Sequence, residues 1–265
     1  MEEDAIHDFI ELTQCRDRKK AERYLRESHW NVNYALNDFY DKEVGNFFST
    51  YKDVPQDNVV YPPELIHVFD QYSEAGVITF EGMITYIGDL SLSIDDLVTI
   101  CLAQLLGWEN LLAPITREQF LAQWFLQGCS TINEMKTVLA DLNGKLEKDR
   151  GYFKEIYMYT FPLLVEPDQN KLDAASTIEY WKLFFDQEKK YPMIIDQELL
   201  DPWFVYLGEQ SENMSVTEDI WKMVYQFFNR FRSLGDVKQG YDEMAAWPIL
   251  IDEFIEYLQD TVPNF

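Results

Sequence analysis

The feature that most constrains the fold is a series of apolar residues at helical spacing that runs from residue 61 to the end of the chain. Gly107 and Gly128 stand where a glycine commonly ends a helix. Capping boxes, which start helices, occur at Ser93/Asp96, Thr116/Gln119, Thr131/Glu134 and Ser176/Glu179. The pattern predicts helices over 64–72, 97–106, 120–125, 135–146, 152–164, 178–185, 198–207, 218–232 and 248–260.

Few segments favour strands. Residues 77–79 and 114–116 are short extended pieces that each stand between two predicted helices. The chain is therefore predicted to be all-α.

The first 43 residues form a separate pattern of three short helices. Their apolar faces are Ile6, Phe9, Ile10 and Leu12, then Ala21, Tyr24 and Leu25, then Val32, Ala35, Leu36, Phe39 and Tyr40. A unit this small has a thin core and suits binding better than catalysis. Residues 44–60 lose the periodicity and carry Gly, Pro and Asn, which is typical of a linker. The predicted domains are thus 1–43 and 61–265.

The charge balance narrows the choice of partners. The chain has 22 Lys and Arg against 47 Asp and Glu, a net charge of -25. This balance argues against nucleic acid and anionic membranes as partners. It fits a basic protein surface, or an acidity that only maintains solubility. No apolar run is long enough to span a membrane.

The N-terminus lacks the basic start and apolar core of a signal peptide. The three cysteines form no CxxC pair, which indicates a reducing compartment. We therefore expect the protein in the cytoplasm or nucleus.

Helix, extended piece and helix also outline an EF-hand, so calcium must be considered. A loop starting at Asp70 has Glu74 and Glu81 at ligand positions but Ala75 where the turn needs glycine. A loop starting at Gln71 places Gly76 at the turn, but then no acidic residue stands at the ligand positions Gln71, Ser73, Ala75 and Gly82. The segment 108–119 supplies fewer ligands still. The sequence therefore predicts an EF-hand-shaped scaffold without metal, and no histidine pairs with a cysteine at zinc-ligand spacing.

Catalytic motifs are absent from the sequence. Cys101 lies in an apolar run, which predicts a buried and inert thiol, and Cys129 is expected near a helix end with a reactive role disfavoured. No glycine-rich phosphate loop and no nucleophile elbow occur. We expect neither a catalytic residue nor a cofactor.

The stretch 241–254, YDEMAAWPILIDEF, combines an apolar run with acid on both sides. Trp247, Ile249 and Ile251 are predicted to be core. No Lys or Arg occurs from residue 241 to 265. The sequence therefore predicts a segment that is half core and half docking surface for a basic partner, with acids at Asp242, Glu243, Asp252, Glu253 and Glu256.

The first 42 residues, with TQC in the first loop and AERYLRESHWNVNYALNDFY after it, resemble a UBA domain. The resemblance implies a three-helix module that binds ubiquitin or a ubiquitin-like modifier. The first loop has Thr-Gln-Cys where that family usually has Met-Gly-Phe or Met-Gly-Tyr. Leu36 and Phe39 would contact the modifier or fill the small core. The implied binding residues are Thr13, Gln14, Cys15, Leu36 and Phe39.

Residues 61–265 resemble the potentiating-neddylation domain of the defective-in-cullin-neddylation family, through VYPPELIHVFDQY, LLAPITREQFLAQWFLQGCSTI, IEYWKLFF and YDEMAAWPILIDEF. The resemblance implies tandem EF-hand-like halves without metal. It implies a scaffold-type ligase with no catalytic residue of its own. Such a protein holds the C-terminal region of a cullin and a ubiquitin-like conjugating enzyme together, so that the modifier passes to a cullin lysine.

The resemblance also implies two sites. The cullin would dock on Asp219, Ala246 and Asp252. The alternative for either aspartate, taken alone, is that it simply lies on a solvated helix face. Ala246 would let a partner approach Trp247 closely. The acetylated N-terminal methionine of the conjugating enzyme would enter an apolar pocket at Ile100, Ala103 and Leu112, or these three residues are plain core.

Two other functions remain open on the sequence. A ubiquitin-receptor adaptor with an acidic helical interaction domain would bind ubiquitin without speeding transfer to a cullin. A calcium sensor would need the ligands that both candidate loops lack.

Overall fold

The computed structural model describes residues 60–265, except 186, 187, 189, 190, 211–213 and 264, and residues 5, 6, 9, 10, 18–27, 30 and 35 of the first part of the chain. The chain divides into two compact units, Met1–Val60 and Tyr61–Phe265. Each unit is considered by itself.

In the first unit, α2 (Arg18–Glu27) packs against helical residues near the N-terminus. The rings of Phe9 and Tyr24 stack with centroids 6.1 Å apart. The predicted face of Ala21, Tyr24 and Leu25 is buried. A small apolar cluster therefore holds the described part of this unit together.

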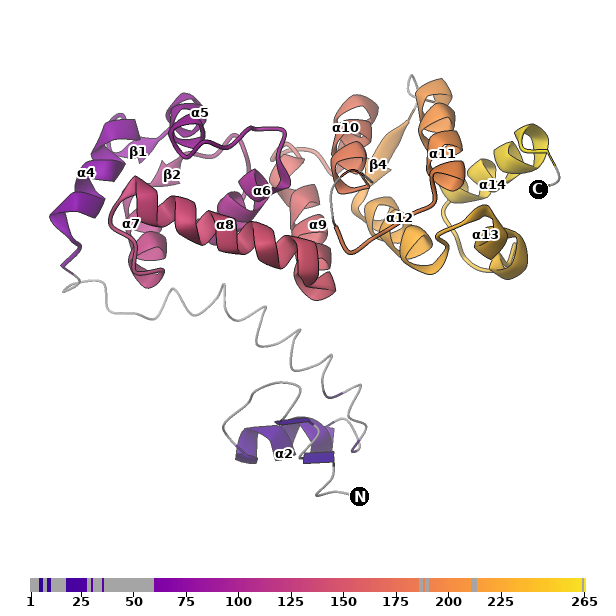
Figure 1. The fold of residues 1–265 in the computed structure, drawn as a ribbon, viewed down its shortest axis with the longest axis horizontal. Coiled ribbons are helices and arrows are strands. Elements are labelled where there is room, and N and C mark those ends of the chain that lie inside the picture. Colours follow the sequence, from indigo (N-terminus) through magenta and orange to yellow (C-terminus); the bar gives the residue numbers. More distant parts are fainter. Residues whose placement is uncertain are drawn as a thin grey trace. The chain divides into compact units, whose positions relative to one another are not determined.

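The second unit is built from helices, which confirms the all-α prediction (Figure 1). They are α4 (Pro63–Tyr72), α5 (Phe80–Asp89), α6 (Leu97–Leu105), α7 (Arg117–Leu126), α8 (Ile132–Lys148), α9 (Arg150–Leu164), α10 (Ala174–Phe184), α11 (Gln197–Gln210), α12 (Glu218–Arg230), α13 (Leu234–Gly240) and α14 (Ile249–Thr261).

Four very short strands pair in twos between these helices. β1 (Val77–Ile78) pairs antiparallel with β2 (Ile115–Thr116), and β3 (Lys171–Asp173) with β4 (Ser215–Thr217). One inward residue of each strand is buried: Ile78, Ile115, Leu172 and Val216. The order helix, strand, helix therefore occurs four times in the second unit. Each strand pair joins two of these helix–strand–helix motifs.

Each strand runs directly into a helix through a capping side chain. Thr79, Asp173 and Thr217 accept hydrogen bonds from backbone N–H groups in the first turns of α5, α10 and α12. Such caps satisfy donors that a helix start leaves unpaired. The two capping boxes predicted at Thr116 and Thr131 are present at α7 and α8. The strand pairs therefore set where the following helices begin.

Two predicted capping boxes are wrong, and one was missed. α6 begins after Asp96, while Ser93 accepts from the N–H of Asp95 in the preceding turn. Ser176 lies inside α10, because Asp173 already caps that helix three residues earlier. Ser233 and Asp236 form a capping box at α13 that was not predicted.

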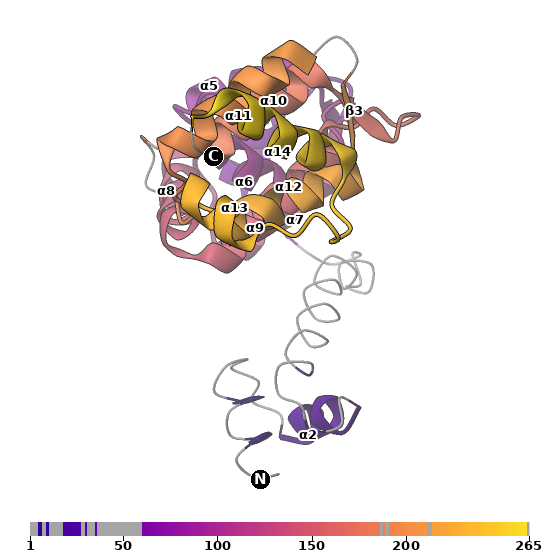
Figure 2. The same cartoon turned by 90° about the vertical axis from the view of Figure 1, so that its right-hand side faces the viewer.

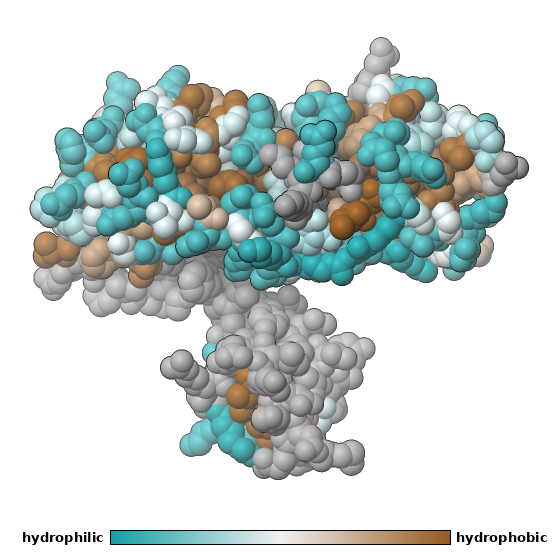
Figure 3. Space-filling model, viewed as in Figure 1, coloured by the Kyte–Doolittle hydropathy of each residue, from teal (hydrophilic) through white to brown (hydrophobic). Residues whose placement is uncertain are grey.

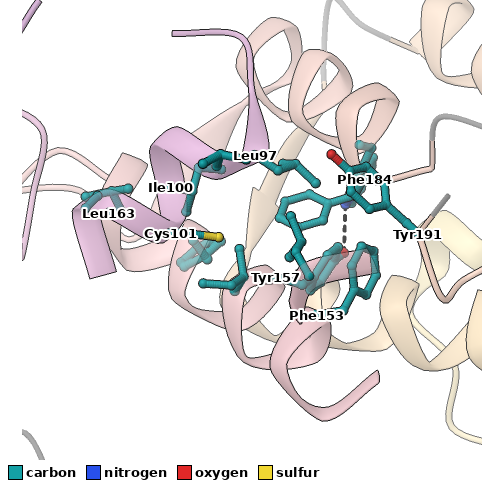
Figure 4. Packing of buried hydrophobic residues seen from close by; sticks show 14 of the residues in the cluster. Leu97, Ile100, Cys101, Phe153, Tyr157, Leu163, Phe184 and Tyr191 are labelled. Atoms are coloured by element: carbon teal, nitrogen blue, oxygen red, sulfur yellow. Dashed lines mark hydrogen bonds between the residues drawn. The ribbon is translucent and has the colours of Figure 1, made fainter. Parts of the chain in front are cut away.

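The centre of the core is aromatic and contains a buried hydrogen-bond chain. Tyr157 of α9 donates to the carbonyl of Trp221 over 2.9 Å and accepts from Nε1 of Trp181 over 2.8 Å. The rings of Tyr157 and Trp221 stack with centroids 4.6 Å apart. Figure 4 shows Phe153 and Phe184 gathered near Tyr157, while Leu163 lies beside Ile100 of α6. This cluster joins α9, α10 and α12.

Viewed from its C-terminal end, the second unit shows α14 lying beside α11 (Figure 2). The ring of Phe254 of α14 lies 4.9 Å from that of Trp203 of α11, edge to face. The C-terminal helix is therefore anchored to the core.

The first calcium-loop candidate has a shape of its own. α4 continues to Tyr72 and α5 begins at Phe80, so Asp70 and Glu81 lie on helices. Gly82 lies against the carbonyl oxygen of Tyr72, which an added Cβ would approach to 2.3 Å. Across the described residues, no three His, Cys, Asp or Glu side chains gather as a metal site.

No helix in this part of the chain has the length and apolarity to cross a membrane.

Candidate functional site

Asp219 lies exposed in the first turn of α12, two residues after the cap Thr217. The hydroxyl of Thr217 accepts from the N–H of Ile220 over 3.3 Å, which fixes this helix start. A carboxylate in a first turn is favoured by the helix dipole. Asp219 therefore presents its charge to solvent from a well-anchored position, as expected.

Ala246 and Trp247 lie in the segment between α13 and α14. Ala246 is exposed, and Trp247 is half-buried against Phe227 and Phe231 with ring centroids 5.9 and 6.2 Å away. The buried Nε1 of Trp247 has no hydrogen-bond partner among the described residues. A partner can thus approach the backbone around Ala246 with little steric hindrance from its methyl group.

Asp252 is half-buried in the first turn of α14 and is held by Tyr241. The Tyr241 hydroxyl donates to Oδ1 of Asp252, and its ring stacks on Trp247 at 6.2 Å and 20°. Burial, followed by the contact with Asp252, raises the pKa of Tyr241. Tyr241 therefore stays a donor at neutral pH and orients the Asp252 carboxylate.

The next acid along α14 is held in the same way. Tyr206 donates to Oε2 of Glu253 over 3.2 Å, and burial, followed by the charge of Glu253, raises the pKa of Tyr206. One buried tyrosine, Tyr206, and one half-buried tyrosine, Tyr241, therefore hold two consecutive carboxylates at the start of α14.

The structure brings Ala246 and Asp252 together through Tyr241 and Trp247. Asp219 is linked to them less directly, because it shares α12 with Phe227, which packs on Trp247. Among the described residues, no hydrogen bond, ion pair or ring contact joins Asp219 to Ala246 or Asp252. We call Asp219, Ala246 and Asp252 the acidic patch.

One core prediction for this stretch is wrong. Ile251 is fully buried, but Ile249 is 73% exposed because it is the first residue of α14 and points away from the core. Met244 is 92% exposed. The surface around the acidic patch is therefore partly apolar.

A separate apolar pocket of about 170 Å³ lies between α5, α6, α9 and α10. Hydrophobic residues come to the surface over α5 and α6 in Figure 3. Of its rim residues, Phe80 is 50% exposed and Ile94 58%. The lining residues are Phe80, Met83, Ile84, Ile87, Ile94, Asp95, Thr99, Ile100, Ala103, Trp108, Leu111, Leu163 and Tyr180.

The wall formed by the segment after α6 is tied to α9. The N–H of Leu111 donates to the carbonyl of Leu163 over 3.1 Å, and the Tyr159 hydroxyl donates to the carbonyl of Trp108. Nε1 of Trp108 donates to the carbonyl of Ala113 over 2.7 Å. These hydrogen bonds fix the position of the segment after α6, which has no regular secondary structure, and so maintain this wall of the pocket.

Two of the three residues expected at this pocket line it, namely Ile100 and Ala103. Leu112 is 68% exposed and lies outside the lining, which its neighbour Leu111 joins instead. Periodicity could not identify this, because the segment 107–114 is not a helix. Phe80, Ile84 and Tyr180 also line the pocket and were not predicted. The signal for them in the sequence is that they are apolar or aromatic residues on α5 and α10.

The residues predicted to bind ubiquitin, Thr13, Gln14, Cys15, Leu36 and Phe39, lie outside the described residues. Cys101 and Cys129 are free and buried. Burial raises the pKa of Cys101 to about 12, so this thiol is protonated at neutral pH, as expected for an inert cysteine.

Comparison with known families gives two matches. The Cullin binding family matches residues 134–257, and the UBA-like domain matches residues 3–45. The first match includes all three residues of the acidic patch.

Two relatives are similar over nearly the whole chain, and a third over about two thirds of it. Defective in cullin neddylation protein 1 of Saccharomyces cerevisiae is 42% identical over 259 residues, which cover 98% of this chain and 94% of the relative. The protein of the same name from Candida glabrata is 42% identical over 268 residues, covering 98% and 97%. DCN1-like protein 3 of Xenopus laevis is 30% identical over 184 residues, covering 67% and 55%.

Proposed function

The chain belongs to the defective-in-cullin-neddylation family, and on that premise we propose that it is a scaffold-type ligase for cullin neddylation. It binds the C-terminal region of a cullin and a ubiquitin-like conjugating enzyme. It promotes transfer of the ubiquitin-like modifier from the enzyme to a cullin lysine. No residue of the chain performs acid–base or nucleophilic chemistry in this proposal.

The proposed mechanism is proximity. Two proteins bound to one rigid body meet at a high effective concentration, and a fixed orientation of the reacting groups lowers the entropic part of the barrier. The modifier's thioester and the acceptor lysine would both be supplied by the bound partners. The scaffold contributes only their placement.

The observation that supports this proposal is that one unit carries two separate candidate sites of different chemistry. The apolar pocket is walled by α5, α6, α9 and α10, and the acidic patch lies on α12 and around the start of α14. Figure 1 shows α5 and α6 toward one end of the second unit and α14 at the other. A scaffold needs such separation so that two partners can bind together.

At the acidic patch we propose that a basic cullin surface docks. Asp219 and Asp252 would receive lysine or arginine side chains, and Ala246 would admit the partner's backbone. Carboxylates at an interface rim contribute mainly to orientation and to the rate of encounter. The absence of Lys and Arg from residue 241 to 265 supports a basic partner.

At the apolar pocket we propose that the acetylated N-terminal methionine of the conjugating enzyme binds. Acetylation removes the terminal positive charge, and an apolar pocket would otherwise have to desolvate an ammonium group. The pocket's volume of about 170 Å³ and its lining by Ile100, Ala103 and Leu111 support a flexible apolar side chain.

A reconstituted transfer assay tests the proposal. We expect the chain to speed attachment of the modifier to a cullin, and Asp252→Arg to weaken cullin binding by roughly tenfold or more. Asp260→Arg, an equal charge change at an exposed position near the end of α14, is the matched control. If the wild-type chain leaves the transfer rate unchanged, the proposed function is wrong.

The pocket is tested separately with peptides. A methionine-starting peptide of the conjugating enzyme should bind when acetylated and lose affinity when its amine is free. Ala103→Phe, which fills the pocket, should abolish this binding, whereas Leu112→Ala outside it should not. Equal binding of both peptides would contradict the pocket assignment.

A second candidate function rests on the UBA-like match at residues 3–45. In that case the chain is a ubiquitin-receptor adaptor, and its binding to ubiquitin would persist in the full chain while the transfer rate stays unchanged. Thr13, Gln14, Cys15, Leu36 and Phe39 are the proposed contacts. We also propose a cytoplasmic or nuclear location, which fluorescence microscopy of the tagged chain tests.

A further inference from the structure

A hollow of about 530 Å³ lies between α13 and α14. Figure 1 shows these two helices together at the C-terminal end of the second unit, away from α5 and α6. The hollow is larger than the apolar pocket of about 170 Å³ at α5 and α6, so it has room for a large side chain. We call it the α13–α14 hollow. Its lining residues are Val237, Lys238, Tyr241, Asp242, Glu243, Met244, Ile255, Gln259 and Phe265.

The α13–α14 hollow combines a fixed floor with an apolar edge. Val237 of α13 and Ile255 of α14 are buried, and the N–H of Tyr241 donates to the carbonyl of Val237 over 2.9 Å. At the edge, the backbone N–H of Met244 donates to Oδ1 of Asp242 over 2.9 Å, while the Met244 side chain is 92% exposed. A flexible thioether side chain adapts to the shape of whatever covers it. The hollow therefore suits an inserted apolar side chain.

The hollow is continuous with the acidic patch. Tyr241 lines the hollow, and its hydroxyl donates to Oδ1 of Asp252. On α14, Ile255 and Gln259 follow Asp252 by three and seven residues, a spacing that places all three on one face of the helix. A partner that docks on Asp252 therefore reaches the hollow along the same face of α14.

The charge around the hollow matches that of the acidic patch. Two acids and one base line the hollow itself. Over residues 230–265, seven Asp and Glu stand against three Lys and Arg. Of these three bases, Arg230 donates to the carbonyl of Gly240 over 3.2 Å, with its guanidinium 4.9 Å from the ring centroid of Phe231. The surroundings therefore favour a basic partner at the hollow as well.

The acidic patch needs an apolar neighbour to bind a protein tightly. Carboxylates at the edge of an interface mainly orient the partner, whereas most of the affinity comes from a few apolar or aromatic side chains that fill pockets. The patch itself supplies two acids and one alanine, and so no large apolar group. Met244 and the 73% exposed Ile249 stand on either side of Ala246 in the sequence, and the hollow lies next to Met244. The surface around the patch therefore contains the missing apolar contact.

We propose that the α13–α14 hollow receives an apolar anchor, a leucine or aromatic side chain, from the same cullin surface whose lysine or arginine side chains bind the acidic patch. The inference rests on the proposed function and specifies the chemistry of the partner. The partner surface is amphipathic, with bases that meet Asp219 and Asp252 and an apolar side chain that enters the hollow. The acids set the orientation, and the anchor slows dissociation.

The test fills the hollow without changing any charge. Gln259 is exposed on α14 and lines the hollow, so Gln259→Trp places a large ring in it. Biolayer interferometry of the full chain on an immobilised cullin C-terminal domain should show roughly tenfold weaker binding, mainly through faster dissociation. The dependence of affinity on salt should stay as in the wild type, because the acids remain. Gln71→Trp, at an exposed position on α4, is the matched control and should keep wild-type affinity.

A second variant removes the apolar edge instead of filling the hollow. Met244→Ser should weaken binding at least about twofold, since the exposed thioether would no longer cover the anchor. Ile194→Ser, at a 66% exposed position between α10 and α11, is its control and should bind as the wild type does. Circular dichroism establishes that all four variants fold.

The outcomes separate this inference from the proposed function. Wild-type affinity in both Gln259→Trp and Met244→Ser, while Asp252→Arg loses binding, would overturn the hollow and leave the proposed function standing. An equal loss in Gln259→Trp and its control would also overturn it. If sedimentation velocity shows a wild-type dimer that Gln259→Trp makes monomeric, the hollow holds a second copy of the chain and the inference is wrong. A wild-type chain that does not bind the cullin domain would contradict both.

Discussion

Tyr241 donates its hydroxyl hydrogen to Oδ1 of Asp252 while its ring stacks on Trp247. The ring of Phe231 lies 6.3 Å from that of Tyr241 and links it to the core. The orientation of one surface carboxylate is thus set by an aromatic stack. A partner that binds Asp252 meets a carboxylate with one oxygen already engaged by Tyr241.

Replacing Tyr241 with phenylalanine should weaken binding of a cullin C-terminal domain by roughly two- to tenfold, the range of one lost hydrogen bond. The ring remains and keeps its place on Trp247, so the loss comes from the freed Asp252 carboxylate. Isothermal titration calorimetry measures the affinity, and a thermal melt checks the fold.

Tyr206→Phe is the matched control, because Tyr206 donates to the adjacent Glu253 in the same way. Glu253 lies outside the acidic patch, so this variant should bind the cullin domain as the wild type does. Wild-type affinity in Tyr241→Phe, or an equal loss in both variants, would show that Tyr241 does not position Asp252 for binding.

Gly82 and Gly88 lie on the same helix and should respond oppositely to alanine. A Cβ at Gly82 would lie 2.3 Å from the carbonyl oxygen of Tyr72, so Gly82→Ala must push α5 away from α4. We expect a loss of about 1–3 kcal/mol in the free energy of unfolding, measured by urea denaturation.

Gly88 has nothing within 4 Å of an added Cβ. Gly88→Ala should therefore change stability little or raise it by up to about 1 kcal/mol through helix propensity. If both alanine variants lose similar stability, the close approach at Tyr72 is not what requires glycine at Gly82.

Local signals in the sequence predicted most helices, while tertiary contacts decided what it missed. The boxes at Thr116 and Thr131 act within one turn, so they are visible in the sequence. α5 was missed because it contains Gly82 and Gly88, which weaken the helical pattern. Packing of the buried Met83, Tyr86 and Ile87 stabilises it instead. The sequence indicated the extended pieces that form β1 and β2 but not β3 and β4, whose pairing joins residues 171–173 to residues 215–217.

The candidate sites divide in the same way. The first-turn position of Asp219 follows from its distance to a threonine cap and was predictable. The contact between Tyr241 and Asp252 depends on how the chain turns between α13 and α14, which no periodicity describes. Likewise Leu111 lines the pocket because its N–H bonds to Leu163, a residue far along the chain.

Tyr157→Phe should cost about 1–3 kcal/mol of stability, although only one oxygen is removed. Nε1 of Trp181 and the carbonyl of Trp221 would each lose a partner in the fully buried centre of the second unit. Tyr257→Phe serves as the control, since this half-buried ring makes no hydrogen bond through its hydroxyl among the described residues. Urea denaturation of both variants compares them, and equal stabilities would contradict the role of the Tyr157 hydroxyl.

The free energy of unfolding should fall as the pH rises above 9, because the buried Cys101 thiol and Tyr72 hydroxyl keep their protons in the folded state. Burial raises the pKa of Cys101 from 9.0 to about 12, and burial together with Asp89 raises that of Tyr72 from 10.0 to about 12. Above its ordinary pKa each group ionises in the unfolded chain but not in the native one. The unfolded state then binds fewer protons, so the free energy of unfolding drops as pH rises.

The contribution of each group is therefore fully present below its unfolded pKa and is lost between that value and about 12. Cys101 should cause a fall that begins near pH 9, with a slope of about 1.4 kcal/mol per pH unit at most. Cys101→Val should reduce the fall that begins near pH 9, to which Cys129 also contributes, and Tyr72→Phe should remove only its own share of the fall that begins near pH 10, to which other tyrosines contribute. Urea denaturation across this range measures it, and curves for Cys101→Val that run parallel to the wild type would exclude Cys101 as the cause.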